Sequence, residues 1–171
     1  MSLRRDVRQC HGFTLIELLI VVALIGIIAA LGAPFLIAAK ASANEASAIG
    51  TARALHSAES TFSSSCGHGA FSVSLADLVS GEFASPDMDI TPKSGFEFVL
   101  AAGNGSAAGP MGCDGLPTRT GYYFSAEPIA DNTGGRAFAT NQNGVIWQDA
   151  TGAAAPAEPF AATATVTPLE R

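Results

Sequence analysis

One long apolar run dominates the N-terminal part of this chain. From Phe13 to Ala39 the sequence reads FTLIELLIVVALIGIIAALGAPFLIAA, which is 27 residues with a single charged side chain, Glu17. A helix of that length extends about 40 Å, whereas the apolar core of a bilayer is about 30 Å thick. A helix inside a soluble core rarely needs an apolar surface on all sides over such a length. The run therefore predicts a helix that spans a membrane.

The charges on either side of the run predict its orientation. Residues 1–12 carry three arginines, Arg4, Arg5 and Arg8, against Asp6. The rest of the chain carries six basic residues against fourteen carboxylates. Because basic residues favour the cytoplasmic side of a membrane span, we expect a cytoplasmic N-terminus, with the residues after the run outside the cytoplasm. The acidic balance also argues against general nucleic-acid binding.

Three kinds of membrane signal compete for the first 43 residues. A secretory signal has an apolar core of about 7–15 residues, which is much shorter than this run, although residues 41–43 supply small side chains for a cleavage site. A plain single-pass anchor explains the length of the run. It does not explain Glu17, because a carboxylate costs about 2.5–3.5 kcal/mol at the bilayer centre and less near the interface. The third kind of signal gives Glu17 a partner.

The residues from Gly12 to Val22, GFTLIELLIVV, resemble the N-terminal signature of type IV pilins and of the pseudopilins of type II secretion. In that family a prepilin peptidase cuts after the glycine on the cytoplasmic side and methylates the new amine. The resemblance implies that cleavage separates Gly12 from Phe13 and that Phe13 is methylated. Residues 1–12 would then be a leader, and the apolar run would be the mature N-terminus.

Three further positions match the family pattern. Glu17 corresponds to its acidic fifth residue, Gly26 to its helix glycine and Pro34 to its helix-bending proline. Glu17 lies about 6 Å along the helix from the Phe13 amine, so a neighbouring subunit displaced by that offset would bring its amine to this carboxylate. Buried ion pairs can fix register, and we predict that Glu17 sets the stagger of subunits. Proline removes a backbone donor, so a kink or local opening is expected between Ala30 and Pro34.

The resemblance also implies a function. The chain is expected to be a structural subunit of a type IV pilus filament, not an enzyme, and to need no cofactor. Its expected partners are copies of itself and other pilins, the prepilin peptidase and an inner-membrane assembly platform. It would lie in the inner membrane before assembly and in an extracytoplasmic or cell-surface filament afterwards. Two alternatives stay open: a type II secretion pseudopilin, and a membrane-tethered binding or enzymatic domain that uses residues 13–39 only as a tether.

The pattern after residue 39 predicts that the helix continues. We expect it from about Thr14 to Thr61, apolar on all sides in its first half and amphipathic in its second, with an end near residues 63–67. The apolar stripe of the second half comprises Ala48, Ala52, Leu55 and Phe62. The charged and polar side chains Glu45, Arg53, His56 and Glu59 are expected mostly on other faces. Such a stripe would pack against a sheet.

The remaining sequence predicts an α+β fold with a small antiparallel meander. A short helix is expected over residues 72–79, with Ser74 as its N-cap. Alternating apolar residues predict strands at 96–100, 122–126, 136–140 and 145–148. The last two flank Asn143-Gly144, a strong hairpin signal. Residues 150–171, rich in Ala, Thr and Pro, show no usable period and are predicted to be a mobile tail.

These patterns divide the chain into five parts. The expected order is a leader (1–12), a membrane or filament-core helix (13–39), an amphipathic continuation of that helix (40–65), a globular sheet domain (66–149) and the tail (150–171).

Three cysteines predict one disulfide. Cys10 falls in the expected leader, which leaves Cys66 and Cys113 as an even pair in an oxidising compartment. A bond between them would close a loop of 48 residues. On the loop-entropy model such a bond stabilises the fold by about 4 kcal/mol.

Metal binding and catalysis find little support in the sequence. His56, Cys66 and His68 match no recognised zinc spacing, and we predict no metal site there. Oxygen-bearing side chains near the last loops would suit either calcium or ordinary turn hydrogen bonds, and turn chemistry is the favoured interpretation; they are Asp131, Asn132, Asn141, Asn143 and Asp149. We interpret Asp87 and Asp89 as part of a solvated turn. The run Ser63-Ser64-Ser65 contains no nucleophile motif. We predict no catalytic residue.

Overall fold

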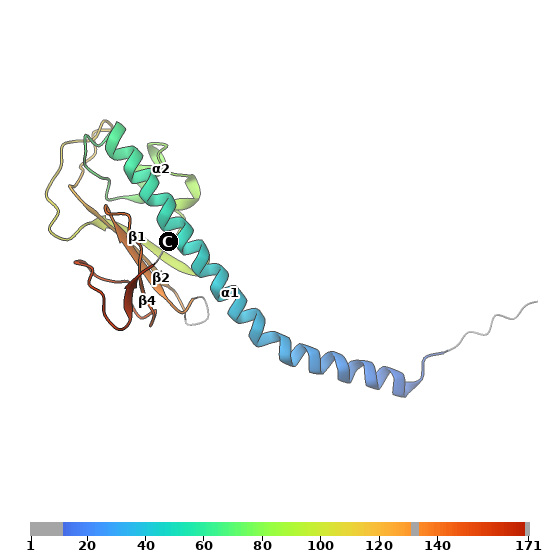
Figure 1. Ribbon diagram of the computed structural model, residues 1–171. Coiled ribbons are helices and arrows are strands. Elements are labelled where there is room, and N and C mark those ends of the chain that lie inside the picture. The colour runs from blue at the N-terminus through green and yellow to red at the C-terminus, as the bar shows by residue number, and fades with distance from the viewer. Residues whose placement is uncertain (1–11, 131–133, 170–171) are drawn as a thin grey trace, which may run out of the picture. The chain divides into compact units, whose positions relative to one another are not determined.

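The computed structural model describes residues 12–130 and 134–169. It divides into two compact units, one up to residue 37 and one from residue 38 on. Helix α1, Leu15–Ser65, is 51 residues long and contributes to both units (Figure 1). The expected long helix is therefore confirmed, and its end at Ser65 lies within the predicted range of 63–67.

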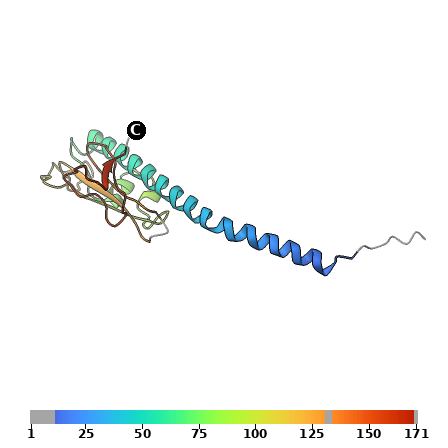
Figure 2. The ribbon, with the colours of Figure 1, turned by 60° about the horizontal axis from the view of Figure 1, so that its bottom comes forward.

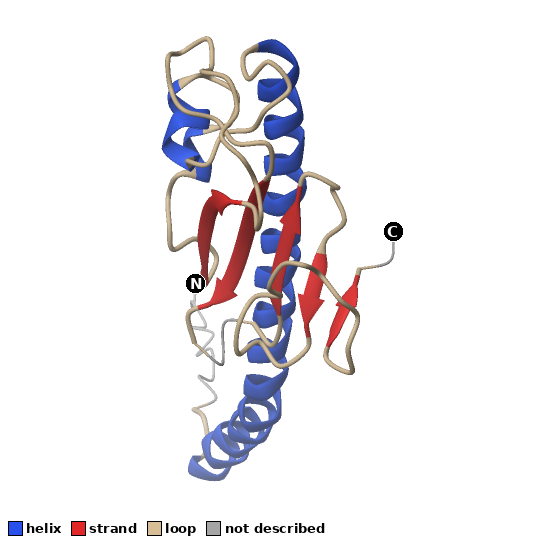
Figure 3. Ribbon diagram, turned by 90° about the vertical axis from the view of Figure 1, so that its left-hand side faces the viewer, coloured by secondary structure: helices blue, strands red, loops and turns tan. Residues whose placement is uncertain are grey.

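The second unit contains a five-stranded sheet. Its strands are neighbours in chain order, and every pair is antiparallel, so the sheet is a meander. Figure 3 shows the five strands in front of α1. The strands are β1 (Phe96–Ala102), β2 (Tyr122–Pro128), β3 (Ala137–Asn141), β4 (Trp147–Asp149) and β5 (Val166–Pro168).

Four of these strands correspond to the predicted ones, and the α+β class is confirmed. The hairpin between β3 and β4 is also present, with a longer connection than expected. The Gly144 N–H donates to the Asn141 carbonyl at 2.9 Å, and Gly144 has a φ of +73° that suits glycine. Val145 and Ile146 complete the turn instead of starting β4, which begins at Trp147.

The core lies between the second half of α1 and one face of the sheet, an arrangement that Figures 1 and 2 show from two sides. All four stripe residues of α1 are at most 2% exposed, which confirms the predicted stripe. Ala48 and Ala52 have small side chains that let the helix approach the sheet closely. In the same core, Phe98 of β1 and Phe124 of β2 stack with ring centroids 5.8 Å apart.

The prediction for the charged residues of α1 is wrong at two positions. Glu45 is only 7% exposed and forms an ion pair with Arg136, and Glu59 is fully buried. Both carboxylates have partners far along the chain, since Glu45 also accepts the N–H of Gly135 and Glu59 accepts that of Ser72. A helical periodicity shows which face a residue occupies but not whether another segment supplies it with a donor.

Two short helical turns precede the sheet. Helix α2, Leu75–Ser80, begins at the predicted N-cap, because Ser74 Oγ accepts the Asp77 N–H at 3.3 Å. The 3₁₀ turn η1, Pro86–Met88, follows it. Leu75, Leu78 and Met88 belong to the same core as α1 and the sheet.

The prediction of a tail without regular structure is wrong. Val166–Pro168 forms β5 and pairs with β4, although Glu170 and Arg171 lie outside the described residues. Tyr123 Oη donates to the Pro156 carbonyl at 2.9 Å, and the rings of Phe160 and Trp147 stack 5.5 Å apart. Strand β3 is buried on both faces as a result. A few well-placed side chains anchor this segment, and its average composition does not reveal them.

Candidate processing and assembly segment

The residues expected to be processed lie just before α1. Gly12, Phe13 and Thr14 precede the helix, and the Phe13 side chain is 79% exposed. The large apolar side chains from Phe13 to Ile37 are all exposed, with Val21, at 44%, the least so. The leader positions 1–11, including Cys10 and the three arginines, lie outside the described residues.

Thr14 forms an N-cap that the sequence analysis missed. Its Oγ1 accepts the Glu17 N–H at 3.2 Å, and its carbonyl accepts the Leu18 N–H at 3.3 Å. Thr14 and Glu17 have the spacing of a capping box, in which a Ser or Thr precedes a Glu by three positions. That spacing is visible in the sequence. The cap places the first helical residue, Leu15, two positions after the expected cleavage site.

Glu17 therefore lies in the first turn of α1. A carboxylate in this position interacts favourably with the positive end of the helix dipole. The ion pairs of the described residues are Lys93–Asp87 and Arg136–Glu45, so Glu17 has no cationic partner within this part of the chain. Its carboxylate stands among exposed apolar side chains.

Gly26 and Pro34 both lie inside α1. A Cβ atom added to Gly26 would meet no atom within 4 Å, so nothing in the described chain requires a glycine there. The helix continues through Pro34, so the chain stays helical there, and the kink or local opening expected between Ala30 and Pro34 stays a prediction. Among the described residues, α1 is the one helix long and apolar enough to cross a membrane.

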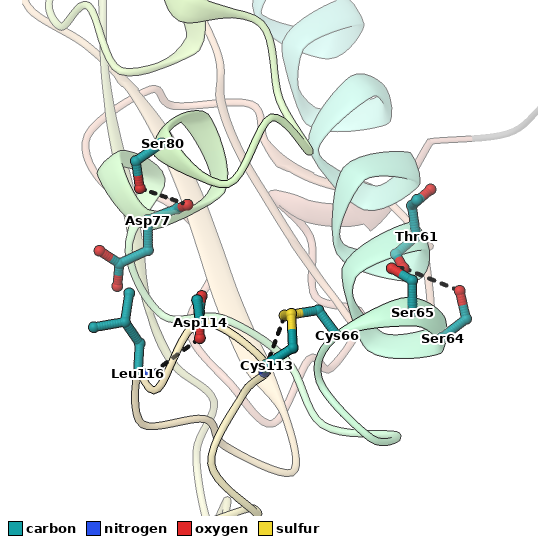
Figure 4. Close-up of a disulfide and its surroundings, with 9 residues drawn as sticks. All are labelled: Thr61, Ser64, Ser65, Cys66, Asp77, Ser80, Cys113, Asp114 and Leu116. Carbon is teal, nitrogen blue, oxygen red and sulfur yellow. Dashed lines mark hydrogen bonds between the residues drawn. A yellow bond between two sulfur atoms is a disulfide. The ribbon is translucent and has the colours of Figure 1, made fainter.

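The predicted disulfide between Cys66 and Cys113 is present, with Cα atoms 4.8 Å apart (Figure 4). The Cys113 N–H donates to the Cys66 carbonyl at 3.0 Å, so a backbone hydrogen bond accompanies the covalent bond. Cys66 directly follows α1, and Cys113 belongs to the loop between β1 and β2. The disulfide therefore joins the end of the helix to the sheet domain.

One of the histidines and two of the oxygen-bearing side chains have hydrogen-bond partners in the structure. Within the described ranges, no group of three or more His, Cys, Asp or Glu side chains is placed to hold a metal ion. His56 Nδ1 instead lies 2.8 Å from Tyr122 Oη. Asp131 and Asn132 lie outside the described residues. Asp149 and Asn141 make turn hydrogen bonds, the first to Thr151 and the second to the Asn143 N–H.

The paired carboxylates and the serine run have structural partners. Asp87 lies beside Lys93 and Ser85, and the hydrogen bond from Lys93 lowers the pKa of this exposed carboxyl. The Ser64 and Ser65 hydroxyls donate to the Thr61 carbonyl in the last turn of α1 (Figure 4).

Among the described carboxylic acids, Glu59 has the largest pKa shift, although the sequence predicted it to lie mostly away from the apolar stripe. Its Oε2 accepts the Ser72 N–H at 3.0 Å, and its Oε1 has no hydrogen-bond partner among the described residues. Burial raises the pKa of Glu59 to about 8. Burial also raises the pKa of Tyr122, with a smaller contribution from the charge of Glu59.

A comparison with known families identifies the N-terminal segment. Residues 7–33 match the model of the prokaryotic N-terminal methylation motif, which is the signature of type IV pilins and pseudopilins. The match includes Gly12, Phe13, Glu17 and Gly26 and ends one residue before Pro34. No curated protein and no solved structure matches the chain. The protein thus carries the pilin-type methylation motif, which includes the start of its long apolar helix, and an α+β domain follows.

Proposed function

We propose that this chain is a structural subunit of a type IV pilus, cut between Gly12 and Phe13, methylated at Phe13 and assembled through α1. The observation that carries the proposal is the methylation motif over residues 7–33, which extends into a helix, Leu15–Ser65, that is long and apolar enough to span a membrane. The motif points to a structural role and away from catalysis. The N-terminal half of α1 then anchors the subunit in the inner membrane and later forms the filament core.

The exposed apolar side chains of α1 support assembly by helix packing. Side chains from Phe13 to Ile37 present an apolar surface that bilayer lipid covers first and neighbouring helices cover afterwards. Gly26, which has open space around its Cα, lets a helix of another subunit approach closely. Pro34 is the position at which α1 can bend to fit the filament, because its ring interrupts the helical hydrogen bonds.

Glu17 is the residue from which we infer a fixed axial offset between neighbouring subunits of the filament. Its carboxylate lacks a cation within the described chain, and an apolar environment makes an unpaired charge costly. The amine that cleavage creates on Phe13 of a neighbouring subunit supplies the opposite charge. In a helix that included Phe13, this residue and Glu17 would lie about 6 Å apart along the axis, so the pair would set a subunit offset of about that length.

The partners follow from this sequence of events. The prepilin peptidase acts first, an inner-membrane assembly platform extracts the subunit, and copies of this chain and other pilins surround it in the filament. The domain from residue 38 on would then lie outside the cytoplasm, where the Cys66–Cys113 disulfide is stable.

A second candidate is a type II secretion pseudopilin, because the same motif occurs in both groups. The two differ in the filament they build. Electron microscopy of cells that express a tagged chain separates them: long surface fibres containing the tag identify a pilin, and short fibres that depend on a secretion system identify a pseudopilin.

The first experiment is the N-terminal sequence and mass of the chain expressed with and without a prepilin peptidase. We expect a start at Phe13 with one added methyl group in the presence of the peptidase and an uncut chain in its absence. A cut after residue 43 that is independent of the peptidase would indicate a secretory signal instead. An uncut chain in both strains would indicate a plain tether.

A further inference from the structure

A cleft of about 530 Å³ lies at the edge of the sheet domain, where the C-terminal segment crosses β3 and β4. One wall is the turn at Asn104 and Gly105, and another is the β3–β4 turn. The third wall comes from the C-terminal segment that the sequence predicted to be a tail. The described residues that line the cleft are Asn104, Gly105, Asn141, Asn143, Val145, Trp147, Glu158, Pro159 and Phe160.

Two aromatic rings form the apolar side of this cleft. Trp147 of β4 and Phe160 stack nearly parallel, with centroids 5.5 Å apart and an angle of 20° between their planes. Phe160 also lies 6.3 Å from the ring of Tyr123. Trp147 and Phe160 are both partly exposed, so the rings are accessible from the cleft. Aromatic rings offer C–H groups of a ligand a flat apolar surface at little conformational cost.

The polar side of the cleft consists mainly of neutral amides. The Asn143 side chain and the Trp147 indole N–H make no hydrogen bond to any residue that the structure describes; both residues line the cleft, Asn143 exposed and Trp147 partly exposed. Asn141 is held in place, since its Nδ2 donates to Glu158 Oε1 at 2.6 Å. Asn104 donates from Nδ2 to the Glu158 carbonyl at 3.1 Å, which leaves its Oδ1 as an acceptor.

The charge of the cleft limits the class of ligand. The described lining residues include no Lys, Arg or His, so a phosphate or carboxylate ligand would find no cation there. Glu158 is the one carboxylate, and both of its oxygens already accept hydrogen bonds, from the Asn104 N–H at 2.6 Å and from Asn141. The lining therefore suits a neutral ligand that has several hydroxyl groups and an apolar face.

From this geometry we infer that the cleft between Trp147, Phe160 and Asn143 is a binding site for a neutral saccharide. Amide side chains donate and accept at once, as sugar hydroxyls do, and the stacked rings pack against the C–H face of a pyranose. The site goes beyond a structural role in a filament, because it gives each subunit a ligand of its own. A cleft of this size takes one or two sugar rings.

Intrinsic tryptophan fluorescence reports on this site alone, because Trp147 is the only tryptophan of the chain. The full chain, purified in a zwitterionic detergent without a sugar headgroup, is first applied to an array of neutral, sialylated and sulfated oligosaccharides. Each neutral glycan that binds the chain is then added to it in increasing concentration while the intrinsic tryptophan fluorescence is measured. We expect retention of neutral hexose or N-acetylhexosamine glycans and a saturable change in the Trp147 signal.

Matched variants locate the binding. Asn143→Ala removes an exposed amide from the cleft and is expected to weaken binding about fivefold to tenfold, the effect of one to two hydrogen bonds. Gln142→Ala, in the same turn but outside this cleft, is the control and should bind like the natural chain. Phe160→Leu keeps an apolar side chain of similar size while removing the ring, and it should weaken binding further.

Three results would overturn the inference. The first is that the chain binds no glycan on the array, and the second is that it binds only sialylated or sulfated glycans. The third is equal affinity in Asn143→Ala, Gln142→Ala and the natural chain. Circular dichroism of each variant confirms that the fold is retained, and Asn143→Ala decides the matter if Phe160→Leu is unfolded.

Discussion

Arg136 donates from both Nε and Nη2 to the same oxygen of Glu45, at 2.9 and 2.6 Å, across 91 positions of the sequence. The other carboxylate oxygen of Glu45 accepts the Gly135 N–H at 2.7 Å, and Arg136 Nη1 donates to Gln148 Oε1. One nearly buried acid on α1 thus connects the helix to the start of β3 and, through Arg136, to β4. Its charge is satisfied by groups that belong to another part of the fold.

Removal of Arg136 should therefore lower the free energy of unfolding, because the Glu45 carboxylate would stay nearly buried without a cation. Arg136→Met keeps the aliphatic part of the side chain but leaves Glu45 without its cation. Because the Arg136 side chain is 37% exposed, water can replace part of the interaction. We expect the free energy of unfolding to fall by about 2 kcal/mol, measured by urea unfolding of the full chain. Arg119→Met, at a cation outside this network, should change it by less than about 0.5 kcal/mol.

The buried Glu59 makes stability depend on pH. Burial raises its pKa from 4.5 to about 8, so between these values the folded chain binds a proton that the unfolded chain has lost. The free energy of unfolding therefore decreases as pH rises through this range, by up to about 5 kcal/mol. Glu59→Gln, which cannot ionise, should remove most of that decrease.

Urea unfolding at the two ends of this pH range checks the Glu59 prediction. The natural chain and Glu59→Gln differ only in this side chain, so the difference between their pH slopes isolates the carboxyl. Glu97→Gln, at an exposed position on β1, is the matched control and should keep the natural slope. A slope unchanged in Glu59→Gln would contradict a raised pKa at this residue.

The disulfide should stabilise the sheet domain strongly. It restricts the unfolded chain over a loop of 48 residues, which corresponds to about 4 kcal/mol. The double variant Cys66→Ser/Cys113→Ser should unfold at a much lower urea concentration than the natural chain. Cys10→Ser leaves this bond intact and should show no loss, and an equally stable double variant would contradict the prediction.

Glu17→Ala separates processing from assembly. The substitution leaves Gly12 and Phe13 in place, so we expect normal cleavage, seen as a Phe13 start by N-terminal sequencing. Filaments that contain the variant should be absent by electron microscopy, because the carboxylate that meets the neighbouring amine is gone. Glu17→Asp, which keeps the charge on a shorter side chain, is expected to retain partial assembly. Normal filaments from Glu17→Ala would show that Glu17 serves only the helix cap.

The parts of the fold that the sequence predicted well are those with a regular period. The stripe from Ala48 to Phe62 repeats every three to four residues, and β1 and β2 alternate, so local pattern and tertiary environment agree there. The Ser74 cap and the Asn143-Gly144 hairpin depend on local chemistry and are also visible in the sequence. The Thr14–Glu17 cap is also visible in the sequence, as a Thr followed three positions later by a Glu. These two residues lie inside the apolar run, where the membrane-span pattern dominates.

The features that the sequence did not predict depend on partners distant along the chain. Glu45 and Glu59 are acceptable inside the protein only because Arg136 and Ser72 supply donors, and no local pattern announces such pairs. The C-terminal segment is similar: its low complexity predicted a mobile tail, whereas Phe160 and Glu158 fix it to Trp147 and Asn104. The candidate saccharide cleft could not be predicted from local sequence patterns either, because its walls come from three separate segments.

The strand order of the sheet has a consequence for how quickly the domain can form. Because β1 to β5 pair with their neighbours along the chain, each pairing closes only the loop between two consecutive strands, and the longest of these loops runs from residue 103 to 121. Folding rates are higher when contacts are local, so such a sheet can form strand by strand. A subunit that must be ready for polymerisation soon after export would benefit from this order of events.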